Sequence, residues 1–169
     1  MTHPVVEQLR FTRSEWQRGL RGLTEDDGAR HFGQMNSIGW IVGHLAWHEQ
    51  RTLFIRRKGE LLVPDIQERY AFGAPMSTPS LKAMRKAWNT VTKAADPFLD
   101  SVTTKDLTRD LPLNGKPSGQ NLGSAIRRMT FHYWFHIGEI QAIRQLLGQK
   151  GLPQYVGNLE AVAAYRPER

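Results

Sequence analysis

Four of the six histidines fall into two pairs with a spacing of four residues, His44 with His48 and His132 with His136. Residues four apart lie on the same face of an α-helix, with Cβ atoms about 5–6 Å apart. Two imidazoles placed in this way can reach one metal ion, and a third from a facing helix would complete a face of three nitrogen ligands. Random placement of six histidines would give about 0.2 such pairs, so the spacing indicates a metal site.

The position of His136 strengthens this interpretation. His136 lies between Tyr133 and Ile140 on an apolar stripe, so its ring is expected to point into the protein. Burying ring nitrogens without partners is costly, and a metal ion on one nitrogen with a hydrogen bond on the other removes that cost. The alternative is a core histidine bonded only to a neighbour, which is the commoner role of a single buried histidine.

Four segments have the apolar periodicity of helices, at roughly 4–22, 38–57, 80–102 and 122–147. Each has a narrow apolar stripe, and four such helices predict an all-α fold, a four-helix bundle. The length fits one domain over residues 1–169. In the first segment Arg13 occupies an apolar position. In the third, Pro97 is expected to kink or break the helix near Ala95.

The connections between these segments differ in length. Residues 58–79 contain three prolines and two glycines and are long enough to cross the bundle between the second and third helices. This connection is expected to form a lid over the site. Asn114-Gly115 predicts a small hairpin, and residues 158–165 a short helix. Gly39 and Gly43 in the second helix indicate either close helix packing or room beside a metal ion.

The composition excludes several classes of site. The chain has no cysteine, which excludes disulfides, thiolate zinc sites, iron–sulfur clusters and a cysteine nucleophile. Tyr133 follows His132 where a zinc-protease helix needs glutamate, so a peptidase of that type is not expected.

The sequence also bounds the location and the partners. The most apolar stretch, 38–46, is too short for a membrane span. The first residues show no secretory signal, so a cytoplasmic location is expected. The net charge is +7, but the basic residues are scattered, so a nucleic-acid partner is not expected.

Two stretches resemble the signatures of the DinB/YfiT-like superfamily. Residues 36–46, NSIGWIVGHLA, resemble its second-helix signature, and residues 132–140, HYWFHIGEI, resemble its fourth-helix signature. The separation of 88 residues between His44 and His132 also fits, and the resemblance covers roughly residues 5–157. It implies an up-down-down-up four-helix bundle, often dimeric, with a divalent metal ion held by His44, His132 and His136.

The resemblance also implies a class of chemistry, because superfamily members with assigned activities include mycothiol-dependent isomerases and bacillithiol transferases. We therefore expect a metal-dependent transferase, isomerase or hydrolase that activates water or an external low-molecular-weight thiol for a small-molecule substrate. Zinc or nickel is the expected ion, with iron or manganese as alternatives. A homodimer is expected. The alternative function is a non-catalytic bundle that binds a metal ion or another ligand.

Two further side chains are candidate catalytic residues. His48 could be a fourth ligand, a general base or a surface residue, and we expect it to be partly exposed without metal contact. Glu49 could orient a ligand or a bound water. Glu139 is expected either behind a metal ligand or at the contact with the first helix. His3 and His31 are expected to lie outside the site.

Overall fold

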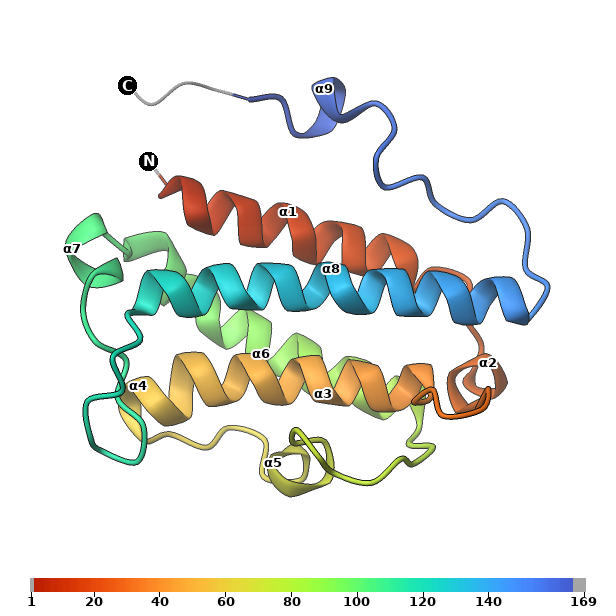
Figure 1. Cartoon of the computed structure of the whole chain (residues 1–169), viewed down its shortest axis with the longest axis horizontal. Coiled ribbons are helices and arrows are strands. Elements are labelled where there is room, and N and C mark those ends of the chain that lie inside the picture. The colour runs from red at the N-terminus through yellow and green to blue at the C-terminus, as the bar shows by residue number, and fades with distance from the viewer. Residues whose placement is uncertain (1, 166–169) are drawn as a thin grey trace.

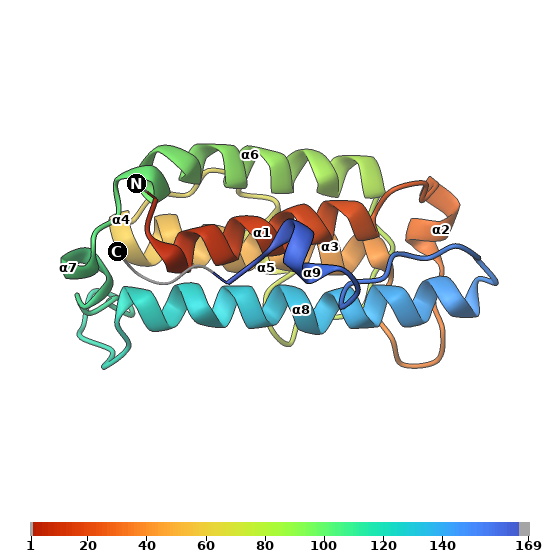
Figure 2. The same cartoon turned by 90° about the horizontal axis from the view of Figure 1, so that it is seen from above.

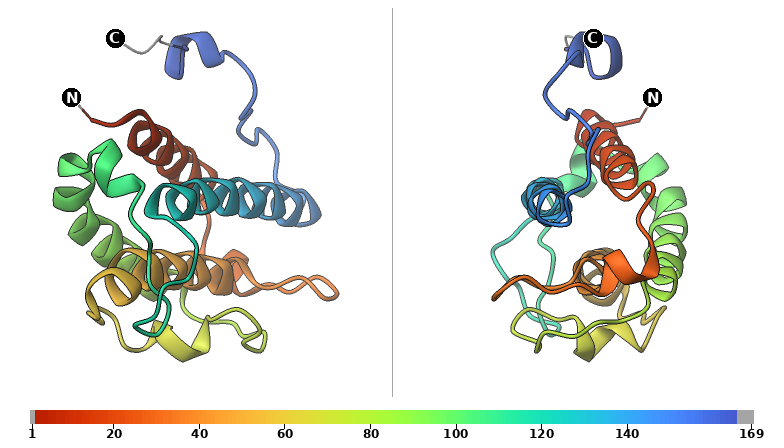
Figure 3. Two further views of the ribbon diagram at one scale, coloured as in Figure 1. Left: turned by 60° about the vertical axis from the view of Figure 1, so that its left-hand side comes forward. Right: turned by 90° about the vertical axis from the view of Figure 1, so that its right-hand side faces the viewer.

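The computed structural model describes residues 2–165 of the chain, and within them the fold is all-α, as predicted. Figure 1 shows α1 and α8 running in one direction and α3 and α6 in the other, which is the expected up-down-down-up order. Pairs α1–α8, α3–α6 and α3–α8 pack against each other. Viewed along the bundle, the four segments surround a common core (Figure 3, right). The long segments are α1 (Pro4–Gly19), α3 (Ile38–Gln50), α6 (Leu81–Ser101) and α8 (Leu122–Leu146).

The long helices begin where a polar side chain can accept from a free backbone N–H. Ser37, Ser80 and Asn121 each accept from the N–H three residues further on, at the starts of α3, α6 and α8. At the start of α1, His3 Nδ1 accepts from the N–H of Val5 at 3.2 Å. These caps place the helix starts where the sequence predicted them.

Shorter elements join the long ones. They are α2 (Glu25–Ala29), η1 (Arg51–Ile55), α4 (Arg56–Lys58), α5 (Ile66–Arg69), α7 (Thr104–Leu107) and α9 (Leu159–Val162). Seen from above, α9 and the chain before it pass over α1 and α8 (Figure 2). The predicted hairpin forms, with Leu113 paired to Lys116 and positive φ angles of 51° at Asn114 and 73° at Gly115.

Helix α3 is buried along its whole length, since all thirteen of its residues are buried. One side faces the bundle core, and the connection that contains α5 lies along another side (Figure 1). Gln50 holds this connection through Oε1, which accepts from the N–H groups of Leu62 at 3.1 Å and Val63 at 2.6 Å. Trp40 Nε1 donates to the Pro75 carbonyl at 3.1 Å. The connection is therefore fastened along α3.

The structure differs from the sequence prediction at Pro97. The sequence predicted a kink or a break near Ala95. Helix α6 continues through Pro97 to Ser101, so a break there is wrong. Pro97 is exposed and lies in the last turns of the helix, where solvent can reach the carbonyl that loses its N–H partner.

No helix within residues 2–165 combines the length and the apolar character needed to cross a membrane.

Gly43 allows α3 to pack closely against its neighbours. A Cβ atom there would lie 2.7 Å from Met84 Sδ and 2.9 Å from Tyr70 Cγ, closer than real side chains approach. At Gly39 a Cβ atom would lie 2.6 Å from the carbonyl oxygen of Pro79. Of the two interpretations of these glycines, the structure favours close packing.

We expect Gly43→Ala to destabilise the protein by about 1–3 kcal/mol, because the added methyl group overpacks the contact with Met84 and Tyr70. Gly138→Ala is the matched control, since a Cβ atom at this exposed position of α8 meets nothing within 4 Å. Gly138→Ala should stabilise the helix by up to about 1 kcal/mol. Urea unfolding measures both changes, and equal effects of the two substitutions would contradict the packing argument.

Candidate metal centre

Three histidines from two antiparallel helices converge on one point, His44 from α3 and His132 and His136 from α8. His132 Nε2 lies 3.2 Å from His44 Nε2 and 2.9 Å from His136 Nε2. One ligand nitrogen from each ring lies within 4.8 Å of the other two. The structure therefore brings together the three residues that the sequence singled out as metal ligands.

The other ring nitrogen, Nδ1, of each of these histidines has its own partner. His44 Nδ1 lies 2.6 Å from the Tyr70 carbonyl oxygen, and His136 Nδ1 lies 2.5 Å from Glu139 Oε2. His132 Nδ1 lies 3.0 Å from His48 Nδ1. A carbonyl oxygen and a carboxylate can only accept, so Nδ1 of His44 and of His136 must donate. In the neutral ring, Nε2 of both residues is then an unprotonated lone pair.

These lone pairs fit a cation. His132 Nε2 can donate its single hydrogen to only one of the two neighbouring Nε2 atoms, so at least one lone pair faces no donor within the cluster. Two nitrogens bound to one zinc ion at the usual 2.0–2.1 Å lie about 3.0–3.4 Å apart, close to the separations found here. The three-histidine group can hold a divalent metal ion.

The surroundings keep the rings in the form that binds metal. Burial lowers the pKa of His44 to about 4, and burial together with the neighbouring histidines lowers the pKa of His132 to about 2. Burial also lowers the pKa of His48 to about 3, with added effects of His44, Arg51 and Arg128. Neutral imidazole is the ligand form, so these rings are ready to bind metal at neutral pH.

We expect the metal-free protein to lose stability in mild acid. The pKa values of His44, His48 and His132 in the folded state lie below the unfolded value of about 6.5. The unfolded state therefore takes up protons first, and the free energy of unfolding falls as the pH drops below about 6.5. The expected slope is about 1.4 kcal/mol per pH unit for each histidine that stays neutral. Urea unfolding at pH 7.5, 6 and 5 measures it, and equal midpoints at pH 7.5 and 5 would contradict it.

His48 corrects a prediction. It was expected to be partly exposed, but it is only 9% exposed and contacts His132. Its ring holds the nitrogen of His132 that faces away from the other two ligands. The spacing of four residues from His44 was the signal for this position, because it places both rings on one face of α3.

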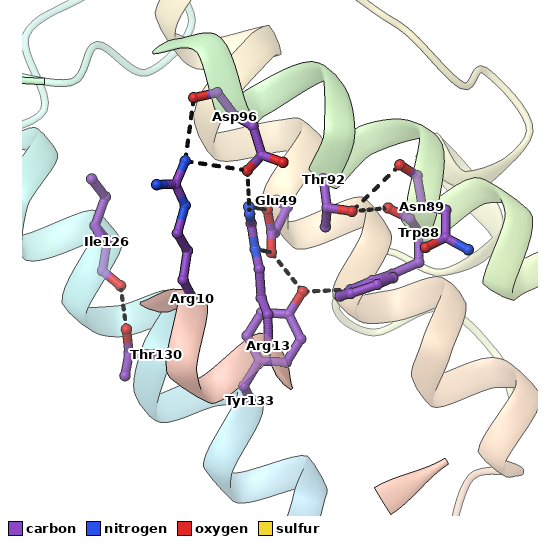
Figure 4. Close-up of polar contacts among 10 residues, drawn as sticks. All are labelled: Arg10, Arg13, Glu49, Trp88, Asn89, Thr92, Asp96, Ile126, Thr130 and Tyr133. Carbon is purple, nitrogen blue, oxygen red and sulfur yellow. Dashed lines mark hydrogen bonds and ion pairs between the residues drawn. The ribbon is translucent and has the colours of Figure 1, made fainter. Parts of the chain in front are cut away.

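Glu49 also differs from its predicted role, because it does not belong to the histidine cluster. It is fully buried, and its carboxylate accepts from Arg13 Nε at 2.9 Å and from the Tyr133 hydroxyl at 2.5 Å (Figure 4). Trp88 Nε1 donates to the same hydroxyl, and Arg13 also pairs with Asp96 at 3.2 Å. Glu49 is thus the centre of an ion-pair network that joins α1, α3, α6 and α8.

Tryptophans enclose the His44 ring. Trp40 stacks on it with ring centroids 4.8 Å apart, and Trp47 does so at 5.2 Å. Tyr70 lies in the connection between α4 and α6, and its carbonyl oxygen contacts His44 at Nδ1. This nitrogen is on the side of the ring away from the converging Nε2 atoms. That connection was expected to be a lid, and it instead supports a ligand from behind. No sequence signal points to Tyr70, because every residue has a carbonyl group.

Comparison with known families adds an independent observation. The sequence profile described as the DinB superfamily matches residues 8–140. The chain belongs to the DinB superfamily. The matched span includes all three converging histidines and Glu139, and membership is compatible with a metal site at this buried group. No curated protein is similar enough to this DinB-superfamily chain to count as a match.

Proposed function

We propose that this DinB-superfamily protein is a metal-dependent enzyme whose divalent ion is held by His44, His132 and His136. One observation carries the proposal: the three Nε2 atoms converge while a partner holds each Nδ1. Three protein nitrogens leave coordination positions for water or substrate, as in catalytic rather than structural zinc sites. Zinc or nickel suits this nitrogen set, with iron or manganese as alternatives.

The proposed reaction is transfer or hydrolysis by an activated water or external thiol. A bound divalent ion supplies this chemistry by lowering the pKa of a coordinated water or thiol. The chain contains no cysteine, so a thiol would have to come from outside. His132 is only half-buried and the Glu139 side chain is 26% exposed, so a small molecule can approach the rings along α8.

The residues around the ligands prepare them for this role. The Tyr70 carbonyl, Glu139 and His48 fix the orientation of the three rings. Such partners of ligating histidines also make the ligand more basic, and their loss typically lowers metal affinity 10–100-fold. Trp40 and Trp47 stack against the His44 ring and shield it from water.

The test compares three forms of the protein, loaded with Zn²⁺ or Ni²⁺, treated with chelator, or carrying His136→Ala. Thiol conjugation to 1-chloro-2,4-dinitrobenzene and hydrolysis of p-nitrophenyl acetate serve as general probes. Turnover that needs both the metal and His136 supports the proposal. One bound ion per chain that stabilises the fold without turnover on any thiol or ester substrate would instead assign a non-catalytic metal-binding bundle.

A further inference from the structure

An arginine lies about one helical turn beyond the histidines on each of the two helices that carry them. Arg51 follows the last residue of α3, and Arg128 lies within α8. Arg51 lies three residues after His48, and Arg128 lies four residues before His132. Because α3 and α8 run in opposite directions (Figure 1), both arginines extend the site toward the same end of the bundle. His48 Nδ1 and His132 Nδ1 are 3.0 Å apart, so each arginine lies about one helical turn beyond this contact, on neighbouring helices.

These two arginines lack acidic partners. Within residues 2–165 neither Arg51 nor Arg128 forms an ion pair, whereas Arg10, Arg13 and Arg18 all do. The guanidinium of Arg51 lies 5.8 Å from the ring centre of Trp47. Two arginines on neighbouring turns of adjacent helices, with no ion-pair partner among these described residues, favour an anion.

Trp47, whose ring lies near Arg51, carries a third unpaired donor. Its side chain is 8% exposed, and its indole N–H is buried without a hydrogen-bond partner among the described residues. An indole N–H can only donate, and a buried donor left unpaired is destabilising. The Trp47 ring stacks on His44 and lies next to His48 and Arg51, so an acceptor that pairs with this N–H would lie beside the metal centre.

We propose that Arg51, Arg128 and the Trp47 indole N–H bind an oxyanion group of the substrate, a carboxylate or a phosphate. The inference rests on the proposed function and adds the substrate class, which is a small organic anion. Arg128 lies four residues from His132, a rise of about 6 Å along the helix. The anionic group therefore lies about one helical turn from the atom that reacts at the metal. The net charge of +7 favours the approach of such a molecule.

The indole N–H resonance of Trp47 in a ¹H–¹⁵N spectrum, assigned with Trp47→Phe, tests this inference. Zn²⁺-loaded and EDTA-treated proteins are titrated with 3-mercaptopropionate, inorganic phosphate and 2-mercaptoethanol. Binding of an oxyanion should shift the Trp47 indole resonance saturably in both the Zn²⁺-loaded and the EDTA-treated protein. Comparison of 3-mercaptopropionate with phosphate shows whether the site binds a carboxylate or a phosphate. On the Zn²⁺-loaded protein, 3-mercaptopropionate should bind at least tenfold more tightly than the neutral 2-mercaptoethanol.

Arg51→Gln/Arg128→Gln should abolish the shift and the tenfold preference without changing the bound zinc measured by mass spectrometry. Lys82→Gln/Lys86→Gln is the matched control, because it removes the same charge from exposed positions on α6. Equal affinity of wild-type protein for the acidic and neutral thiols, with no shift by either anion, would overturn the inference without needing a variant. Failure to bind zinc would overturn the proposed function alone, since the EDTA-treated protein still reports on the oxyanion site.

Discussion

We expect His132→Ala to reduce the bound metal from about one ion per chain to less than about a tenth. His132 is the ring shared by both close contacts, with His44 Nε2 at 3.2 Å and His136 Nε2 at 2.9 Å. Its removal leaves only two of the three ligand nitrogens. In the wild type, metal at one hundred times its Kd should raise the free energy of unfolding by about 2.7 kcal/mol, and this increase should vanish in the variant.

His31→Ala is the control for this prediction. His31 is exposed, and within residues 2–165 its ring forms a hydrogen bond only with the Met35 carbonyl oxygen. It should keep the full metal content and the stabilisation by metal. Metal content by mass spectrometry and thermal unfolding with and without EDTA measure both effects. Stoichiometric metal in His132→Ala would show that the ion binds somewhere else.

Substitutions of Glu139 and His48, which contact the Nδ1 atoms of the ligands, should reduce metal binding less than the loss of a ligand does. Glu139→Gln keeps an acceptor for His136 Nδ1 but removes the charge, and His48→Phe removes the partner of His132 Nδ1. Both substitutions should lower metal affinity by about 10–100-fold rather than abolish it. This order of effects separates residues that touch the ion from those that orient the ligands.

Helical periodicity was sufficient to predict that the paired histidines share helix faces, and the resemblance to the superfamily signatures singled out His44, His132 and His136. The same periodicity places His48 on the face of His44, but it does not show how deeply α3 is buried. His48 packs against His132 of α8 and is only 9% exposed. That packing depends on contacts distant in sequence, which a local pattern does not contain.

The role of Glu49 shows a second limit of sequence reasoning. Arg13 stood at an apolar position of the first helix, which was a sign of a buried charge needing a partner. Glu49 was assigned to the site because it follows His48, but one residue corresponds to a rotation of about 100° around an α-helix. The side chain therefore points toward α1 and meets Arg13. Arg13 and Glu49 are partners although they lie 36 residues apart in the chain.

We expect Glu49→Gln to be one of the most destabilising single substitutions, by about 3–5 kcal/mol, because it leaves the buried guanidinium of Arg13 without its main counter-charge. Arg13→Met should have an effect of similar size, since it leaves Glu49 as a buried unpaired charge. The double variant Arg13→Met/Glu49→Gln removes both charges, and the glutamine oxygen can still accept from Tyr133. It should therefore be less destabilised than either single variant.

Urea unfolding of the four proteins gives the coupling free energy between Arg13 and Glu49 directly. The exposed pair Lys58–Glu60 is the control, because the same cycle there should change stability by less than about 1 kcal/mol.

The Arg13–Glu49 ion-pair network should also affect metal binding. Glu49 adjoins His48 on α3, and its partner Tyr133 adjoins His132 on α8, so this contact sets the register in which the two histidine helices meet. Glu49→Gln should therefore weaken metal binding as well, whereas the Lys58–Glu60 variants should not. An unchanged metal affinity in a destabilised Glu49→Gln protein would show that the two helices keep their register without the ion pair.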